Sequence, residues 1–439
     1  MDYALCIIQD DPEDWQRESI KMRDVYKNAL VTICAQDSPN PFGGCFSRRD
    51  PLIRRPIVLP LYNEEGLLDG ELFWSRDVGV PSGSPGPLGP LDYRAWTLQE
   101  QVLSGRVLAY CEGTVFWFCS TTALWEAKPI WEKDIQRLSD YAKLKRLVIN
   151  YDAWPVSRML RSAKKTRRAA YDAWYDLVGK YSGRNITKPK DRMVAISAVA
   201  EAMSLILDDQ YVAGLWKRDI IRGLLWMSVR GRNVRPRRAK RGQGYVAPSW
   251  SWASINHGAV LALFSMKLNC GILTYGSQII TPEFRFRRYE YMEELPVKAP
   301  SDPEILTVQC SNIGTSPFGQ VKSGTIRLKG YTREVVLRPR GKNLYDRALH
   351  TKIGKAHIDE FRLLSSRKLV VTCLFMARYV KEDEEAFLSS SKDIQQFGKC
   401  ICLGLVPTRL RKNEYRRIGL AEIDYWKWDM EEKREIFLV

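Results

Sequence analysis

One predicted helix combines a guanidinium, an aromatic ring, an amide and a carboxylate within seven positions: Arg94, Trp96, Gln99 and Glu100. They belong to YRAWTLQEQVLSGRVLAY, residues 93–110, which continues into an apolar, strand-like run. On a helix, side chains three and four positions apart are neighbours, so Trp96, Gln99 and Glu100 share a face. We expect Trp96 to pack and the amide and carboxylate to bond loop backbone or Arg94. The alternative is that this polar face contacts a ligand.

The elements that must position this helix begin at the N-terminus. The apolar run YALCII at 3–8, an acidic cap followed by Pro12, and the apolar run at 30–35 predict strand, helix and strand. This order is typical of a βαβ unit. Strands at 55–61 and 70–74 are candidates to cover the edge of the first strand.

The helix that carries Trp96 is expected from about Asp92 to Ser104, with Gly105 as its C-cap. The runs RVLAYC and TVFWFC follow it and predict a hairpin that turns at Glu112 and Gly113. Both strands are apolar enough to be central in a sheet. The first part of the chain, residues 1–124, is therefore predicted to be α/β.

The rest of the chain changes from helical to β-rich patterning. Residues 125–244 predict a helical region, with a stripe of Tyr171, Trp174, Tyr175 and Val178 and further helices at 192–207 and 218–229. Residues 245–439 predict a β-rich region, with strands at 259–265, 305–310, 324–330, 368–380, 398–406 and 434–439.

Composition predicts a folded protein with a strongly basic surface. Hydrophobic residues make up 45% and aromatic residues 11% of the 439 positions, which excludes a disordered chain. The net charge of +17 favours contact with phosphates or acidic surfaces, without indicating any chemistry. Much of it lies in basic runs at 161–168 and 230–242. We interpret these as solvated loops; the alternative is a nucleic-acid-binding surface that uses Arg235, Arg237, Arg238 and Lys240.

Several classes of site are disfavoured by residue type and spacing. The ten Cys form no C-x-x-C pair and only three His are present, so we predict no metal site. Cys400 and Cys402 should share one face of a strand. No phosphate-binding glycine loop occurs, and the three His, at 257, 350 and 357, have no recognisable nucleophile partner. The acidic cluster Asp10, Asp11, Glu13 and Asp14 is explained by helix capping and the helix dipole.

The segment PSWSWAS, residues 248–254, raises the possibility of a serine nucleophile. No glycine flanks its serines, so it is not a nucleophile elbow. We expect an extended chain that packs Trp250 and Trp252 against the core. Neither a signal peptide nor an apolar run of membrane-spanning length is visible, and the cysteines look like buried apolar residues. We therefore expect a cytoplasmic protein in a reducing compartment.

Three blocks in order, ALCIIQDDPEDWQRESIKMRDVYKNALVTICA, GGCFSRR and YRAWTLQEQVLSGRVLAY, closely resemble the fungal heterokaryon incompatibility (HET) domain. The later segments YSGRNITKPKDRMVAISAVA, YVAGLWKRDIIRGLLW and APSWSWASI resemble the region that accompanies this domain. The resemblance spans about residues 2–255. The family pattern begins with a further strand and a Trp-Gly block, so we expect residues 1–124 to be a partial HET domain, truncated at its N-terminus.

The resemblance implies a protein of self/non-self recognition that triggers programmed cell death through contacts with protein partners. The HET domain is also thought to be distantly similar to TIR domains, some of which cleave NAD. By that analogy the first domain is TIR-like but incomplete, NAD is a possible substrate, and Glu18, three residues after Trp15, is the candidate catalytic acid. Such a carboxylate could stabilise the oxocarbenium-like state formed as nicotinamide leaves. A solvent-facing helix glutamate and an inactive truncated copy remain alternatives.

Overall fold

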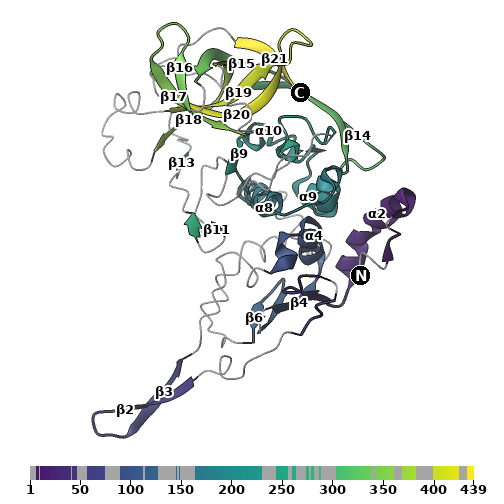
Figure 1. Cartoon of the computed structure of the whole chain (residues 1–439), viewed down its shortest axis with the longest axis vertical. Coiled ribbons are helices and arrows are strands. Elements are labelled where there is room, and N and C mark those ends of the chain that lie inside the picture. Colours follow the sequence, from purple (N-terminus) through teal and green to yellow (C-terminus); the bar gives the residue numbers. More distant parts are fainter. Residues whose placement is uncertain are drawn as a thin grey trace.

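The computed structural model describes three successive parts of the chain, stacked along its long axis (Figure 1). The description covers residues 6–8, 10–40, 42–46, 57–74, 89–111, 114–126, 145, 148, 164–229, 244–255, 260–263, 273–275, 278–280, 286–287, 303–338, 342–359, 368–381, 399–424 and 433–439.

The first part is a mixed α/β unit, as predicted. Its sheet has the order β1-β4-β5-β6; β1 runs parallel to β4 and the other pairs are antiparallel. Helices α2 and α4 complete the unit, and α4 covers one face of the sheet. The elements are α2 (Pro12–Asn28), β1 (Thr32–Ala35), α4 (Ala95–Leu103), β4 (Arg106–Cys111), β5 (Thr114–Cys119) and β6 (Ala123–Trp125), with the 3-10 turn η1 (Pro90–Tyr93) before α4.

The start of α2 corrects one prediction and confirms another. Residues 6–8 form no strand, and residues 3–5 lie outside the described residues. The Ile8 N–H donates to the Asp14 carboxylate at 2.9 Å, so this segment is held at the helix end and not in the sheet. Asp11 caps the helix by accepting from the N–H groups of Glu13 and Asp14, as the acidic residues before Pro12 predicted.

Two further expectations for this part are wrong. Strands β2 (Ile57–Tyr62) and β3 (Leu68–Trp74) pair with each other as a separate hairpin, and they cover no strand edge at residues 6–8, where the first strand had been expected. They are joined by a short turn, and neighbours in sequence pair most readily. Helix α4 ends at an extended Ser104 and has no left-handed glycine cap at Gly105.

The middle part is helical around residues 167–207. It contains α8 (Lys164–Ser182), η3 (Pro189–Arg192), η4 (Val194–Ile196), α9 (Ser197–Leu207), β7 (Tyr211–Val212), β8 (Leu215–Trp216), α10 (Ile220–Gly223), β9 (Trp226–Val229) and η5 (Trp252–Ser254). The helix predicted at 218–229 is correct only for one turn, α10. Its second half is β9, which pairs with β10 (Val260–Leu263), because a short, continuously apolar run fits a buried strand as well as a helix.

The last part is a large sheet, and each strand predicted after residue 300 overlaps an observed one. Its strands are β13 (Phe286–Arg287), β14 (Glu304–Asn312), β15 (Val321–Leu337), β16 (Asn343–Asp346), β17 (Lys352–Ile358), β18 (Leu369–Lys381), β19 (Lys399–Pro407), β20 (Glu414–Asp424) and β21 (Lys433–Leu438). A separate small hairpin consists of β11 (Leu273–Tyr275) and β12 (Gln278–Ile280). Six strands of the large sheet close into a ring in the order β15-β18-β19-β20-β17-β16-β15. Cys400 and Cys402 are both buried in the same cluster of core residues, as their alternation predicted.

A continuous hydrophobic core joins the three parts. It includes Leu98 of α4, Val199 of α9 and Leu403 of β19. At its centre, the carbonyl of Gly214 accepts from the indole N–H of Trp174 at 3.2 Å and from that of Trp252 at 2.9 Å. A Cβ atom on Gly214 would lie 2.4 Å from the Trp252 Nε1, and its φ of +94° favours glycine. Only a glycine therefore fits where the two indoles meet.

Candidate functional site

Helices α2 and α4 meet along a seam that contains the residues named from the sequence. The rings of Trp15 and Trp96 lie edge to face, with centroids 6.3 Å apart and planes at 87°. One turn further along α4, the carboxylate of Glu100 accepts a hydrogen bond from Tyr26 of α2. Burial raises the pKa of Glu100, while the Tyr26 hydrogen bond and the charge of Arg94 oppose that shift.

Gln99 faces the middle part of the chain. Its side chain is buried, and its Oε1 accepts from the backbone N–H of Ala198 in the first turn of α9 at 3.0 Å. Its Nε2 is buried without a hydrogen-bond partner among the described residues. The amide thus bonds backbone, but in the first turn of a helix and not in a loop as expected, and it links the α/β unit to α9.

A strap from residues 181–188 holds the start of α4. Asn185 bridges backbone on both sides of Arg94: its carbonyl accepts from the Ala95 N–H at 2.9 Å and its N–H donates to the Tyr93 carbonyl at 2.5 Å. The Arg184 guanidinium donates to the Arg94 carbonyl at 3.2 Å and lies 3.5 Å from Asp92. The Arg94 backbone is therefore fixed, while its side chain is exposed.

A buried polar cluster lies at the carboxyl end of β1, where α/β sheets commonly place their functional groups. Asp92 accepts from the Gly89 N–H at 3.0 Å and from the Gln36 amide, and Gln101 donates to Gln36 at 3.3 Å. Burial raises the pKa of Asp92, against the charge of Arg184. Sequence reasoning missed this cluster because its members are far apart in the chain.

Lys145 is the most unusual member of this neighbourhood. Its side chain is fully buried, its ammonium donates to the Gln101 carbonyl at 2.7 Å, and it lies 4.7 Å from the centre of the Phe118 ring. Burial lowers the pKa of Lys145 to about 7, whereas the thiol of nearby Cys34 has its pKa raised by burial to about 12. Lys145 therefore places an amine that changes charge near neutral pH inside a buried site, and no residue pattern in the sequence distinguished it.

Glu18 lies on α2, one turn after Trp15. Its side chain is 16% exposed, and its carboxylate pairs with Lys21 at 2.8 Å and with Arg17 at 3.5 Å. Of the acidic residues at the helix start, Asp11 caps α2 and Asp14 accepts from the Ile8 N–H. Among the described residues, no group of His, Cys, Asp and Glu side chains has a metal-binding arrangement.

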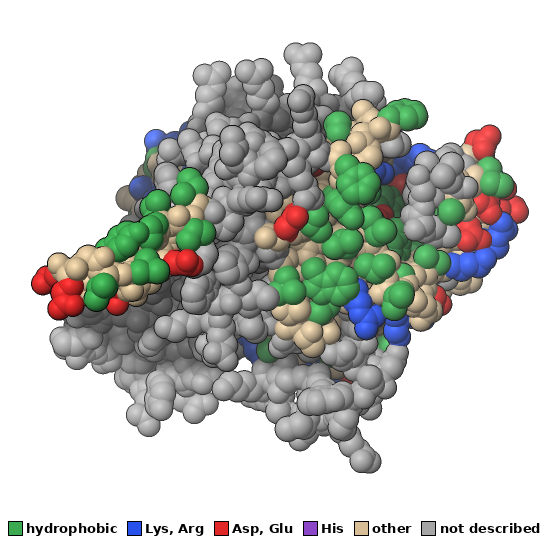
Figure 2. All heavy atoms as spheres, turned by 90° about the horizontal axis from the view of Figure 1, so that it is seen from below, with side chains coloured by type: hydrophobic (Ala, Val, Ile, Leu, Met, Phe, Trp, Pro, Cys, Tyr) green, Lys and Arg blue, Asp and Glu red, His purple; other side chains and the backbone are tan. Residues whose placement is uncertain are grey.

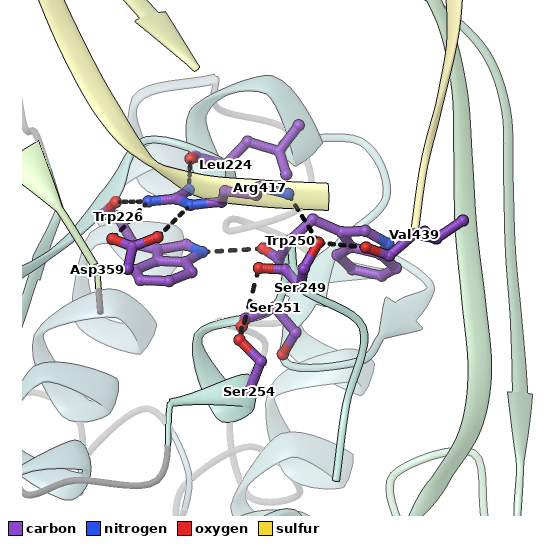
Figure 3. Close-up of polar contacts among 9 residues, drawn as sticks. All are labelled: Leu224, Trp226, Ser249, Trp250, Ser251, Ser254, Asp359, Arg417 and Val439. Atoms are coloured by element: carbon purple, nitrogen blue, oxygen red, sulfur yellow. Dashed lines mark hydrogen bonds and ion pairs between the residues drawn. The ribbon is translucent and has the colours of Figure 1, made fainter. Parts of the chain in front are cut away.

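The PSWSWAS segment forms a second polar centre, against the closed sheet (Figure 3). Arg417 of β20 is fully buried; it pairs with Asp359 at 2.9 Å, donates to the carbonyls of Leu224 and Trp226, and stacks 3.5 Å from the Trp226 ring. Its backbone N–H donates to the Ser249 Oγ at 2.9 Å. A buried guanidinium therefore joins the middle part of the chain to the last part.

The serine hydroxyls of this segment bond backbone carbonyls and so stabilise the local fold. Ser249 also bonds the Val439 carbonyl, and Ser254 donates to the Ser251 carbonyl at 2.8 Å. Trp250 and Trp252 are buried, which confirms that they pack, but the chain turns through η5 and is not extended. A cavity of about 540 Å³ opens beside the segment, between Tyr245, Pro248 and the Arg416 to Ile418 stretch.

The basic residues Arg235, Arg237, Arg238 and Lys240 lie outside the described residues, as does His257. His350 lies in a turn, and His357 on β17 contacts Glu422 of β20 at 2.5 Å. The nucleic-acid alternative therefore stays a prediction.

The match to a known protein family lies in the first part of the chain. Residues 3–100 match the family model described as Heterokaryon incompatibility protein (HET). Residues 3–100 are a HET domain by this match. The matched range begins before α2 and ends at Glu100 in α4, so it includes both sides of the seam between these helices. A HET domain implies a role in heterokaryon incompatibility and cell death.

Searches of curated proteins and of solved structures gave no match to the chain. No helix within the described residues is long and apolar enough to cross a membrane.

Proposed function

We propose that this chain triggers cell death during fungal self/non-self recognition, and that it does so through contacts with protein partners. The HET match to residues 3–100 carries the proposal. The structure supports it by the arrangement of the matched residues: Trp96, Gln99 and Glu100 hold α4 between α2 and α9. We propose that the boundaries near residues 124 and 244 separate this HET domain from the helical and β-rich regions, which are joined to it through one core.

Inducible expression of the full-length chain in a filamentous fungus tests the signalling role. We expect loss of viability within hours of induction, and we expect the variant Trp15→Ala/Trp96→Ala to lose this effect, because the seam between α2 and α4 loses both rings. Leu410→Ser, at an exposed site in the last part, is the matched control and should kill as the wild type does. Normal growth at a protein level equal to that of an active HET protein would contradict the proposal.

The finer proposal is that the HET domain cleaves NAD, with Glu18 as the catalytic acid. Water would replace nicotinamide at the ribose anomeric carbon, giving ADP-ribose and nicotinamide, and the Glu18 carboxylate would stabilise the positive charge that develops there. Its limited exposure beside Trp15 supports this role, because a carboxylate shielded from water interacts more strongly with such a charge.

Release of nicotinamide from NAD by the purified chain is the measurement. We expect Glu18→Gln to lower the rate by about 100-fold or more, as expected when an electrostatic contribution to the transition state is lost. Glu13→Gln, at an exposed position on the same helix, should leave the rate unchanged. Equal rates for wild type and Glu18→Gln would refute the enzymatic proposal and leave the signalling proposal standing.

A further inference from the structure

The sheet of the HET domain has an apolar face on the side away from α4. Because side chains alternate along a strand, Cys34, Val107, Ala109, Phe116 and Phe118 are buried on the α4 side. Ile33, Leu108, Tyr110, Val115 and Trp117 project to the opposite side, where Ile33 pairs with Leu108 and Leu108 with Trp117. We call these five residues the open face. Ile33 is 60% exposed.

The other four residues are half-buried, and an entirely apolar composition is unusual for a sheet face that is partly accessible to water. An antiparallel sheet with one solvated face normally carries polar residues there. Seen from below, hydrophobic side chains gather in a patch over this part of the molecule (Figure 2). The Phe46 ring packs on Tyr110 at 5.4 Å between centroids but is itself 84% exposed, so it extends the apolar surface more than it covers it. Such a patch marks an interaction site.

The hairpin of β2 and β3 supplies a second apolar surface. It projects away from the body of the molecule (Figure 1), and within the described residues its strands pair only with each other. Ile57, Leu59, Leu61 and Leu72 lie on one side of it and are 44–50% exposed. A two-stranded hairpin alone is marginally stable in water, so packing on another surface would stabilise this one.

Charge indicates which surface that is. Residues 57–74 contain four carboxylates, Glu64, Glu65, Asp69 and Glu71, and no Lys or Arg, in a chain of net charge +17. Arg106 is exposed at the start of β4, on the same side of the sheet as Leu108. The acidic hairpin is therefore complementary to the rest of this same chain, both in apolar character and in charge.

We propose that two copies of this chain associate by exchanging hairpins. The apolar side of each hairpin packs on the open face of the other copy, and the acidic turn lies toward Arg106. The contact is reciprocal, as a two-fold symmetric dimer requires, so it closes without forming filaments. This proposal does not depend on the cell-death activity proposed above.

Light scattering after size exclusion, over a micromolar concentration series of the full-length chain, tests the dimer. We expect the wild type to be a dimer. For Leu59→Ser/Leu61→Ser we expect the dissociation constant of the dimer to rise by about tenfold or more, because truncating central apolar contacts weakens an interface by that order. Leu410→Ser is the matched control and should dimerise as the wild type does. A wild type that is monomeric throughout would overturn the proposal, and would mean that a different protein covers both surfaces.

Mixing two variants separates exchange of hairpins from other dimers. Ile33→Ser alters the open face at an exposed position, so the fold should persist. In each homodimer of Leu59→Ser/Leu61→Ser or of Ile33→Ser, both reciprocal contacts are damaged. A mixed dimer keeps one intact contact, so we expect mixing to restore association. If Ile33→Ser dimerises as the wild type does, the hairpins pack on each other and the exchange is refuted.

Discussion

Replacing Arg417 with Ala is expected to lower the free energy of unfolding by about 3–5 kcal/mol, the cost of breaking a buried ion pair from one side. Arg417 is fully buried, and four of its contacts are lost together: the Asp359 carboxylate, the carbonyls of Leu224 and Trp226, and the Trp226 ring. The Asp359 carboxylate would then remain buried without its partner guanidinium. Denaturant unfolding, followed by tryptophan fluorescence, measures the change.

Two further variants make this prediction specific. Arg416→Ala removes the neighbouring, exposed guanidinium, and its effect should stay within about 0.5 kcal/mol. The double variant Asp359→Leu/Arg417→Met should recover much of the lost stability, because apolar residues of similar size can replace a buried pair. A change below about 1 kcal/mol for Arg417→Ala would show that the polar centre of Figure 3 does not hold the last part of the chain to the middle part.

Lys145→Met should change the pH dependence of stability. Burial lowers the pKa of Lys145 to about 7 in the folded state, against an ordinary value of 10.5. Between these values the unfolded chain binds more protons than the folded chain, so the free energy of unfolding rises with pH. The contribution of Lys145 to it is therefore most favourable at high pH and is lost as the pH falls toward 7. The wild type should therefore gain about 2 kcal/mol between pH 7 and pH 9 relative to Lys145→Met.

The comparison is between the two proteins at each pH. The buried cysteines and tyrosines also titrate toward the alkaline end, but they are common to both proteins and cancel in the difference. Lys190→Met, at an exposed position, is the control and should track the wild type across the range. A constant difference between wild type and Lys145→Met would mean that the Lys145 amine keeps its ordinary pKa.

Local signals in the sequence predicted much of the fold. The acidic cap before Pro12 marked the start of α2, and apolar, strand-like runs marked the long strands after residue 300. The closure of the sheet was not predictable in this way, since it depends on β15 pairing with both β16 and β18. Such pairing joins segments far apart in the chain, and a strand carries no local mark of its distant partner.

The candidate site, too, could be predicted from the sequence only where the signal was local. Helical spacing was enough to place Trp96 on a face with Gln99 and Glu100. It could not indicate that Lys145 and Arg417 are buried, because a charge becomes buried only where tertiary partners surround it. Asp359 lies 58 positions from Arg417, and Gln101 lies 44 positions from Lys145. The sequence had suggested Glu18 by family analogy alone, and its role stays a prediction.

The bridge between Arg94 and Asn185 bears on how chains of this kind could exchange parts during evolution. It is made by main-chain atoms, so almost any side chains at these two positions preserve it. The neighbouring link is different, since it requires an amide at Gln99 to reach the Ala198 N–H. A recombinant that joined the first part of one gene to the middle of another would therefore tolerate drift at the bridge but would need a hydrogen-bond acceptor kept at position 99.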